Sequence, residues 1–137
     1  MRYTLLDGSR DGLILVARVL LMILFVVFGW SKLTGFSGTA GYMATMGVPL
    51  PTVSAAVAVI MEFFVGLAIV LGFYTRPLSL LLGLYTLAAA LLGHPFWNMA
   101  DPDRIGAMIN FYKNVSIAGG LLLLCLAGPG KYSLDGR

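Results

Sequence analysis

The chain has 137 residues, of which 59% are hydrophobic and only 11% are charged, and its formal net charge is +3 at pH 7. Soluble domains carry about 25% charged residues, so this composition excludes a soluble globular domain. A bilayer-spanning helix needs about 20 mostly apolar residues. We therefore expect an all-α polytopic membrane protein in which residues 1–137 form a single membrane domain, a bundle of four transmembrane helices.

Four apolar segments follow one another along the chain. We expect helices at about 12–33, 52–73, 77–95 and 107–127. The connections between them contain glycine and proline, which are typical of turns. Pro77 stands at a favourable first helical position, and Gly128-Pro129-Gly130 should end the last helix.

The first apolar segment is expected to stay in the protein rather than to be cleaved as a signal peptide. It follows basic residues, as a signal peptide does, but it is longer than a usual apolar core of such a peptide. Bulky Trp30 and charged Lys32 stand where a cleavage site requires small residues.

The distribution of Lys and Arg between the connections predicts the orientation in the membrane. One side would hold five basic residues: Arg2, Arg10, Arg76, Lys131 and Arg137. The other side would hold three: Lys32, Arg104 and the nearby Lys113. We therefore predict that both termini are cytoplasmic. This topology explains the pI of about 9.2, so we do not expect nucleic-acid binding.

Cysteine and histidine usage excludes several kinds of site. Cys125 is the only cysteine, which rules out an intramolecular disulfide, a CxxC redox pair and a thiolate metal cluster. His94 is the only histidine, which rules out a haem held by two histidines of one chain. We expect no metal site and no covalent cofactor.

Five ionisable residues lie inside or beside the apolar segments. They are Arg18, Lys32, Glu62, His94 and Lys113. A charge in hydrocarbon is costly, so each should face the bundle interior and have a partner. Helical spacing supports this expectation, because each lies on a stripe that also holds small residues, which let helices approach closely. The stripes are 18/25/29/32, 54/58/62/66, 83/87/90/94 and 110/113/117/120.

The helical rise gives the depth of the two innermost charges. Arg18 lies roughly 9 Å and Glu62 roughly 15 Å from the same end of the bundle, a difference that an extended arginine can bridge. We predict an ion pair between Arg18 and Glu62. Such a pair is open to two interpretations, a structural pair that fixes helix register or a part of a functional pocket.

The remaining ionisable residues gather near the opposite end. Lys32, His94 and Lys113 lie near the outer ends of their helices, with Asn110 and Trp97 close by. One interpretation is an interfacial belt of aromatic rings and snorkelling lysines. The other is a ligand-binding site, favoured for His94 and Lys113 because they lie on inward-facing stripes.

Several short motifs, in order and spacing, resemble those of the DoxX family of small four-helix bacterial inner-membrane proteins. The resemblance covers about residues 13–135. It rests on Arg18 with Phe28-Gly29-Trp30-Ser31-Lys32, Glu62 with Gly66, Gly72-Phe73-Tyr74-Thr75-Arg76, His94-Pro95-Phe96-Trp97, Phe111-Tyr112-Lys113-Asn114, Gly128-Pro129-Gly130 and Ser133-Leu134-Asp135.

The resemblance implies a location in the bacterial inner membrane and an association with membrane redox chemistry. On this hypothesis the protein is a quinone- or small-molecule-binding subunit of a membrane redox complex. His94 and Lys113 would hydrogen-bond the ligand, and Arg18, Glu62, Lys32, Asn110 and Trp97 would complete the pocket. An oxidoreductase partner protein would supply the electrons.

Two alternatives remain open on the sequence alone. The protein could be a non-enzymatic scaffold or chaperone-like membrane helper, in which case the charged cluster is architecture. It could also be a small-molecule transporter, which for a four-helix chain implies a homo-oligomer.

Overall fold

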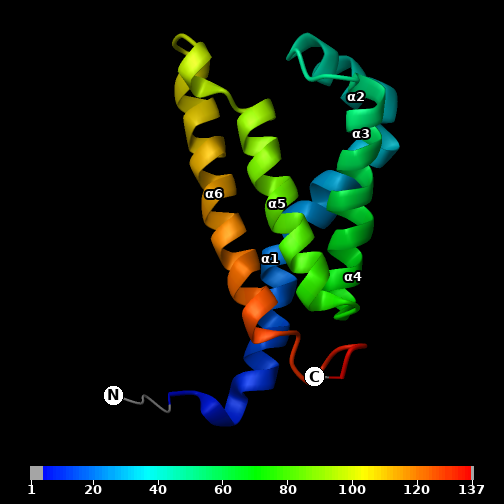
Figure 1. Cartoon of the computed structure of the whole chain (residues 1–137), viewed down its shortest axis with the longest axis vertical. Helices are drawn as coiled ribbons and strands as arrows, with labels where there is room; N and C mark the ends of the chain where they lie inside the picture. Colours follow the sequence, from blue (N-terminus) through cyan, green and yellow to red (C-terminus); the bar gives the residue numbers. More distant parts are fainter. Residues whose placement is uncertain (1–4, 137) are drawn as a thin grey trace.

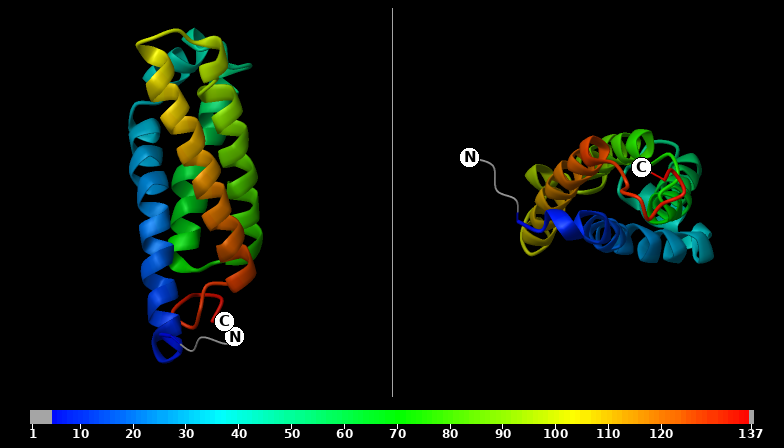
Figure 2. Two further views of the ribbon diagram at one scale, coloured as in Figure 1. Left: turned by 90° about the vertical axis from the view of Figure 1, so that its left-hand side faces the viewer. Right: turned by 90° about the horizontal axis from the view of Figure 1, so that it is seen from below.

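The structure is a computed structural model that describes residues 5–136. It is 80% helical, and the described range contains no strand. Four helical spans are long and apolar enough to cross a membrane: Asp7–Thr34, Pro51–Leu71, Thr75–Asn98 and Asp103–Ala127. They lie side by side in an elongated bundle (Figures 1 and 2). The predicted all-α, four-span architecture is confirmed.

The spans consist of regular helices with one wide turn. Helix α1 covers Arg10–Thr34, α5 covers Thr75–Gly93 and α6 covers Asp103–Ala127, and the short 3-10 turns η1 and η3 cover Asp7–Ser9 and Phe96–Asn98. The second span is continuous but changes pitch, from α3 at Pro51–Val59 through the π-helical turn η2 at Ile60–Val65 to α4 at Gly66–Leu71.

One helix lies where only a connection was expected. Helix α2 covers Phe36–Thr45, between the first two spans, and packs against α3. Its run of Gly, Ser and Thr has weak intrinsic helix propensity, which is why the sequence indicated a loop. Tertiary packing overrides that weak preference, because α2 places half-buried Met43 against the rest of the bundle.

Small residues set the distance between α1 and the second span. A Cβ atom added at Gly29 would lie 2.5 Å from the backbone nitrogen of Phe63, which no side chain tolerates. A Cβ atom added at Gly66 would lie 3.4 Å from the side chain of Val26 and 3.5 Å from that of Phe25, which is ordinary contact distance. Buried Phe25 belongs to the apolar core, so the glycines bring the two helices together around it.

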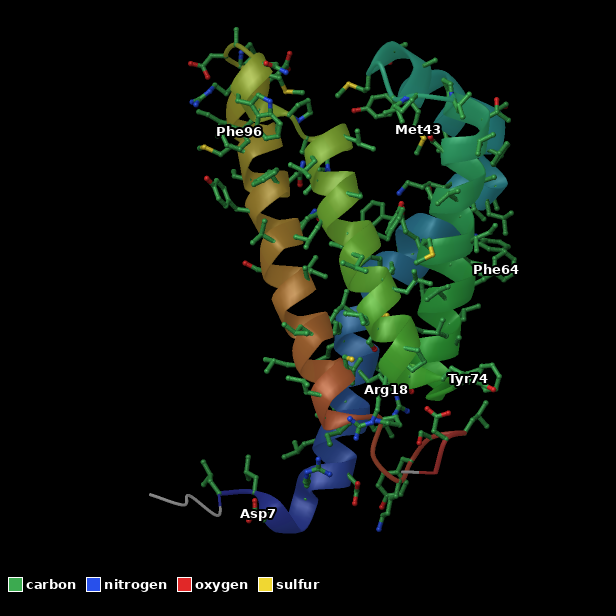
Figure 3. All side chains as sticks on the ribbon, viewed as in Figure 1. Asp7, Arg18, Met43, Phe64, Tyr74 and Phe96 are labelled. Carbon is green, nitrogen blue, oxygen red and sulfur yellow. The ribbon has the colours of Figure 1, made fainter. Side chains whose placement is uncertain are left out.

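The end of the bundle formed by the α4–α5 turn (72–74) and the C-terminal tail (128–136), here called the closed end, is held by Arg18 (Figure 3). Arg18 is 1% exposed. Its guanidinium donates hydrogen bonds to the carbonyl oxygens of Val70, Pro129 and Tyr132. One side chain of α1 therefore binds both α4 and the tail.

Further polar contacts fasten the tail at the closed end. The carboxylate of Asp135 accepts hydrogen bonds from the backbone N–H groups of Tyr74 and Thr75, both at 2.9 Å, and so caps the start of α5. The guanidinium of Arg76 donates to the carbonyls of Cys125 and Leu126 in the last turn of α6. These contacts satisfy backbone groups that helix ends leave unpaired.

The arrangement confirms that the start of the first span, the second connection and the tail share one end. Arg10, Arg76 and Lys131 lie there, and the N–H of Lys131 donates to Asp11 at 3.1 Å. Arg2 and Arg137, which also entered the charge count, lie outside the described residues. That this end faces the cytoplasm stays a prediction.

Replacing Arg18 should loosen the closed end. In Arg18→Met the carbonyls of Val70, Pro129 and Tyr132 lose the charged donor that they share. We therefore expect the free energy of unfolding to fall by about 2 kcal/mol or more, and proteolysis within 128–136 to become faster. Arg18→Lys should rescue only part, because an ammonium lacks the planar fork of donors. Exposed Arg10→Met is the control. A tail equally protected in all variants would contradict this role.

Replacing Gly29 should separate α1 from η2. Gly29→Ala forces a methyl group against backbone atoms of Phe63, and overpacking of this kind costs about 1–3 kcal/mol. Gly119→Ala is the matched control, because a Cβ at Gly119 in α6 meets nothing within 4 Å. Thermal unfolding in detergent should show a lower midpoint for Gly29→Ala alone, and equal midpoints would refute the close approach.

Candidate ligand-binding cavity

A buried carboxylate links three helices in the half of the bundle away from the closed end. Glu62 stands in the π-helical turn η2, and its Oε1 lies 2.7 Å from Nζ of Lys32 on α1. Its Oε2 accepts a hydrogen bond of 2.7 Å from the hydroxyl of Tyr85 on α5. Both carboxylate oxygens are therefore satisfied, as a charge in an apolar environment requires.

The predicted ion pair between Arg18 and Glu62 is wrong. Gly29 of α1 lies level with Phe63, so Glu62 meets Lys32, near the far end of α1. Arg18 lies level with Val70, where the tail supplies further carbonyl acceptors. The depth estimate placed Arg18 within reach of Glu62, but it could not anticipate that irregular backbone would offer partners at the arginine's own level.

A cavity of about 760 Å³ opens beside Glu62. It extends toward the open end, defined here as the end that carries α2 and the α5–α6 connection at 94–102, where Figure 3 shows Met43 and Phe96. Its walls come from α1, α2, α3, α5 and α6 and are mostly apolar. Apolar lining residues include Phe25, Phe28, Met43, Met46, Val53 and Leu92.

Polar groups on α5 and α6 form a second polar region of the cavity lining. His94 directly follows the last residue of α5, and its backbone N–H donates to the carbonyl of Ala90 at 3.1 Å. Nζ of Lys113 on α6 donates to Oδ1 of Asn110 at 3.1 Å. The cavity therefore combines mostly apolar walls with polar groups on facing helices, a composition that small-molecule sites share.

The cavity brings together most of the residues that the sequence singled out. Five of them line it: Lys32, Glu62, His94, Asn110 and Lys113. Arg18 and Trp97 are not among its lining residues. Arg18 instead serves the closed end, because the tail carbonyls bind its guanidinium.

Trp97 belongs to an aromatic cluster at the open end. Its ring lies 5.3 Å from that of Phe96 and 5.5 Å from that of Phe111. The guanidinium of Arg104 lies 5.7 Å from the centroid of Phe96. Half-exposed Trp97 thus fits the interfacial aromatic belt that was one of the two sequence interpretations.

Sequence reasoning missed several residues of the cavity. Tyr85 was detectable, because a phenolic hydroxyl in the middle of an apolar span needs a hydrogen-bond partner. Tyr42 and Met46 were not, because they depend on the unexpected helix α2 and the turn after it. The π-helical pitch around Glu62 had no sequence signal, although such turns are frequent at functional sites.

No group of three or more potential metal-binding side chains (His, Cys, Asp or Glu) occurs within residues 5–136. The side chains that bind Glu62 are an ammonium and a phenol. This chemistry suits hydrogen bonding to an organic molecule rather than metal coordination.

The fold defines a small four-span membrane protein with an internal cavity, and comparisons place it among known proteins. The DoxX family profile matches residues 13–95. Inner membrane protein YphA of Escherichia coli is 49% identical over 138 residues, covering 100% of this chain and 98% of that protein. Inner membrane protein YqjF of the same organism is 46% identical, covering 92% of each chain. This protein belongs to the DoxX family of integral membrane proteins.

A more distant similarity reaches into eukaryotes. The ER-derived vesicles protein ERV29 of Saccharomyces cerevisiae is 24% identical over 129 residues, which is 94% of this chain but 34% of that protein. No solved structure gives a significant match.

A double-mutant cycle should reveal the coupling between Lys32 and Glu62. Lys32→Met leaves a buried carboxylate with the Tyr85 hydroxyl alone, and Glu62→Gln leaves an ammonium without its counter-ion. We expect each to cost about 1–3 kcal/mol in the free energy of unfolding. The double variant should cost clearly less than the sum, because it leaves no unpaired charge. Additive losses in denaturant unfolding would show that the pair contributes no coupling.

Proposed function

We propose that this protein binds a small lipid-soluble molecule in the cavity at its open end, as the membrane subunit of a redox complex, and that the molecule is a quinone. The observation that carries the proposal is the cavity itself. A space of about 760 Å³ with mostly apolar walls matches a ring and the start of an apolar tail. A bound quinone would supply reversible electron and proton transfer, which the side chains of this chain lack.

The residues present fit such a ligand. His94, Asn110 and Lys113 offer N–H donors for a carbonyl oxygen. Phe25 and Phe28 offer aromatic surface for a ring. Lys32 and Tyr85 hold the carboxylate of Glu62 in a fixed position on one side of the cavity. Glu62 is the group that would exchange a proton with a ligand.

The asymmetry of the bundle favours binding over transport. The closed end is sealed by Arg18, Arg76 and Asp135, which bind the tail or the helix ends. Passage through that end would require these contacts to break together. A ligand therefore enters and leaves on the side of the open end or from the lipid, and electrons come from an oxidoreductase partner protein.

We place the protein in the bacterial inner membrane with both termini cytoplasmic. The two Escherichia coli relatives are inner membrane proteins. The excess of basic residues in the sequence segments at the closed end supports this direction by the positive-inside rule. The cavity would then open toward the periplasmic side.

The proposal is tested by extracting what accompanies the protein. Purification in mild detergent from native membranes, followed by ultraviolet spectra and mass spectrometry of the extract, should yield a quinone at a fixed ratio to protein. His94→Ala should lose most of it, by tenfold or so, because a charged or polar hydrogen bond contributes about 1.4 kcal/mol or more. His94→Gln should retain part of the binding.

Trp97→Ala is the control for this experiment, because Trp97 lies near His94 in sequence but outside the cavity lining. It should keep the quinone. Thermal unfolding of each variant separates loss of ligand from loss of fold. Absence of quinone together with a stably co-purifying protein would refute the proposal and support the scaffold or chaperone-like helper.

A further inference from the structure

We propose that the α5–α6 wall of the cavity is an anion subsite, and that the cavity selects amphiphiles whose head group carries an acidic oxygen. The inference goes beyond the proposed function, because it concerns the same cavity but holds whether or not a quinone occupies it. It rests on a charge imbalance within the cavity and on the kind of hydrogen-bonding groups that surround the excess charge.

The charged residues that line the cavity do not balance. They are Lys32, Glu62 and Lys113. Lys32 and Glu62 neutralise each other across 2.7 Å. Lys113 contacts the neutral amide of Asn110, and within residues 5–136 no carboxylate lies at ion-pair distance from it. The described cavity therefore holds one positive charge in excess.

The groups around Lys113 are mainly donors. Oδ1 of Asn110 accepts from Lys113, which leaves the amide NH₂ of Asn110 to donate. Asn114, one turn from Asn110 on α6, also lines the cavity. Lys113 and Lys32 both lie close enough to act electrostatically on His94. A carboxylate or another oxygen anion matches these donors, whereas a cationic head would meet Lys113 with like charge.

The rest of the cavity suits an apolar chain. Phe28, Met46 and Leu92 line it together with further apolar side chains. A soluble anion would gain nothing from this surface, whereas an amphiphile buries its tail there while its head reaches Lys113. Lys113 is exposed and makes no ion pair among the described residues, so its ammonium is accessible to an anionic head group and charge selectivity should be measurable.

The inference is tested with probes that share one chain and differ in head group. Equilibrium binding of radiolabelled dodecanoate, dodecanol and dodecyltrimethylammonium would be measured with the whole protein in a neutral maltoside detergent. We expect dodecanoate to bind about tenfold tighter than dodecanol, the effect of one charge-assisted hydrogen bond, and the cation to bind most weakly.

Three variants assign the preference to Lys113. Lys113→Gln should abolish the difference between dodecanoate and dodecanol, and Lys113→Arg should keep it. Lys131→Gln is the matched control, because exposed Lys131 lies at the closed end, away from the cavity. Equal binding of the acid and the alcohol to the native protein, or a preference that persists in Lys113→Gln, would overturn the inference.

The outcome is separable from that of the quinone experiment. Quinone retention without any preference for dodecanoate leaves the proposed function standing and overturns the anion subsite. A Lys113-dependent preference for dodecanoate without quinone supports the anion subsite and overturns the quinone.

Discussion

The ion pair between Lys32 and Glu62 is the interaction on which the half of the bundle toward the open end depends. A carboxylate in an apolar environment needs a counter-ion, and the ammonium reaches it only because Gly29 lets α1 approach η2 to backbone contact. Tyr85 adds α5 to the same carboxylate. One acidic side chain thus fixes three helices and at the same time forms a wall of the cavity.

The two ends of the bundle meet the same physical requirement in different ways. At the closed end, the carbonyls and N–H groups of helix ends and tail are bound by Arg18, Arg76 and Asp135, so polar groups satisfy one another within the chain. At the open end, the ammonium of Lys113 contacts only a neutral amide among the described residues. Contacts within the chain account for the charges at the closed end, whereas the charge of Lys113 has no counter-ion among the described residues.

Hydrophobic periodicity in the sequence was enough to predict the four spans and the inward direction of Gly29, Glu62 and Ala90, because these depend on helix geometry and the cost of exposing charge to lipid. It could not predict the partner of Arg18, which binds carbonyls of an irregular tail far along the chain. The helical spacing also placed Leu87 on an inward-facing stripe, but its side chain is 40% exposed. A stripe defined by spacing covers a wider part of the helix surface than the part that packs against its neighbours.

These differences change how the ionisable residues divide between structure and function. The sequence grouped Arg18 with Glu62 as one candidate pair, whereas the contacts assign Arg18 to the tail and Glu62 to Lys32 and Tyr85. Both sets are saturated by the protein itself and need no ligand. The polar groups of His94 and Lys113 face a cavity that is mostly apolar. Within the described residues no carboxylate pairs with Lys113, so these two side chains are the ones whose contacts a molecule in the cavity would complete.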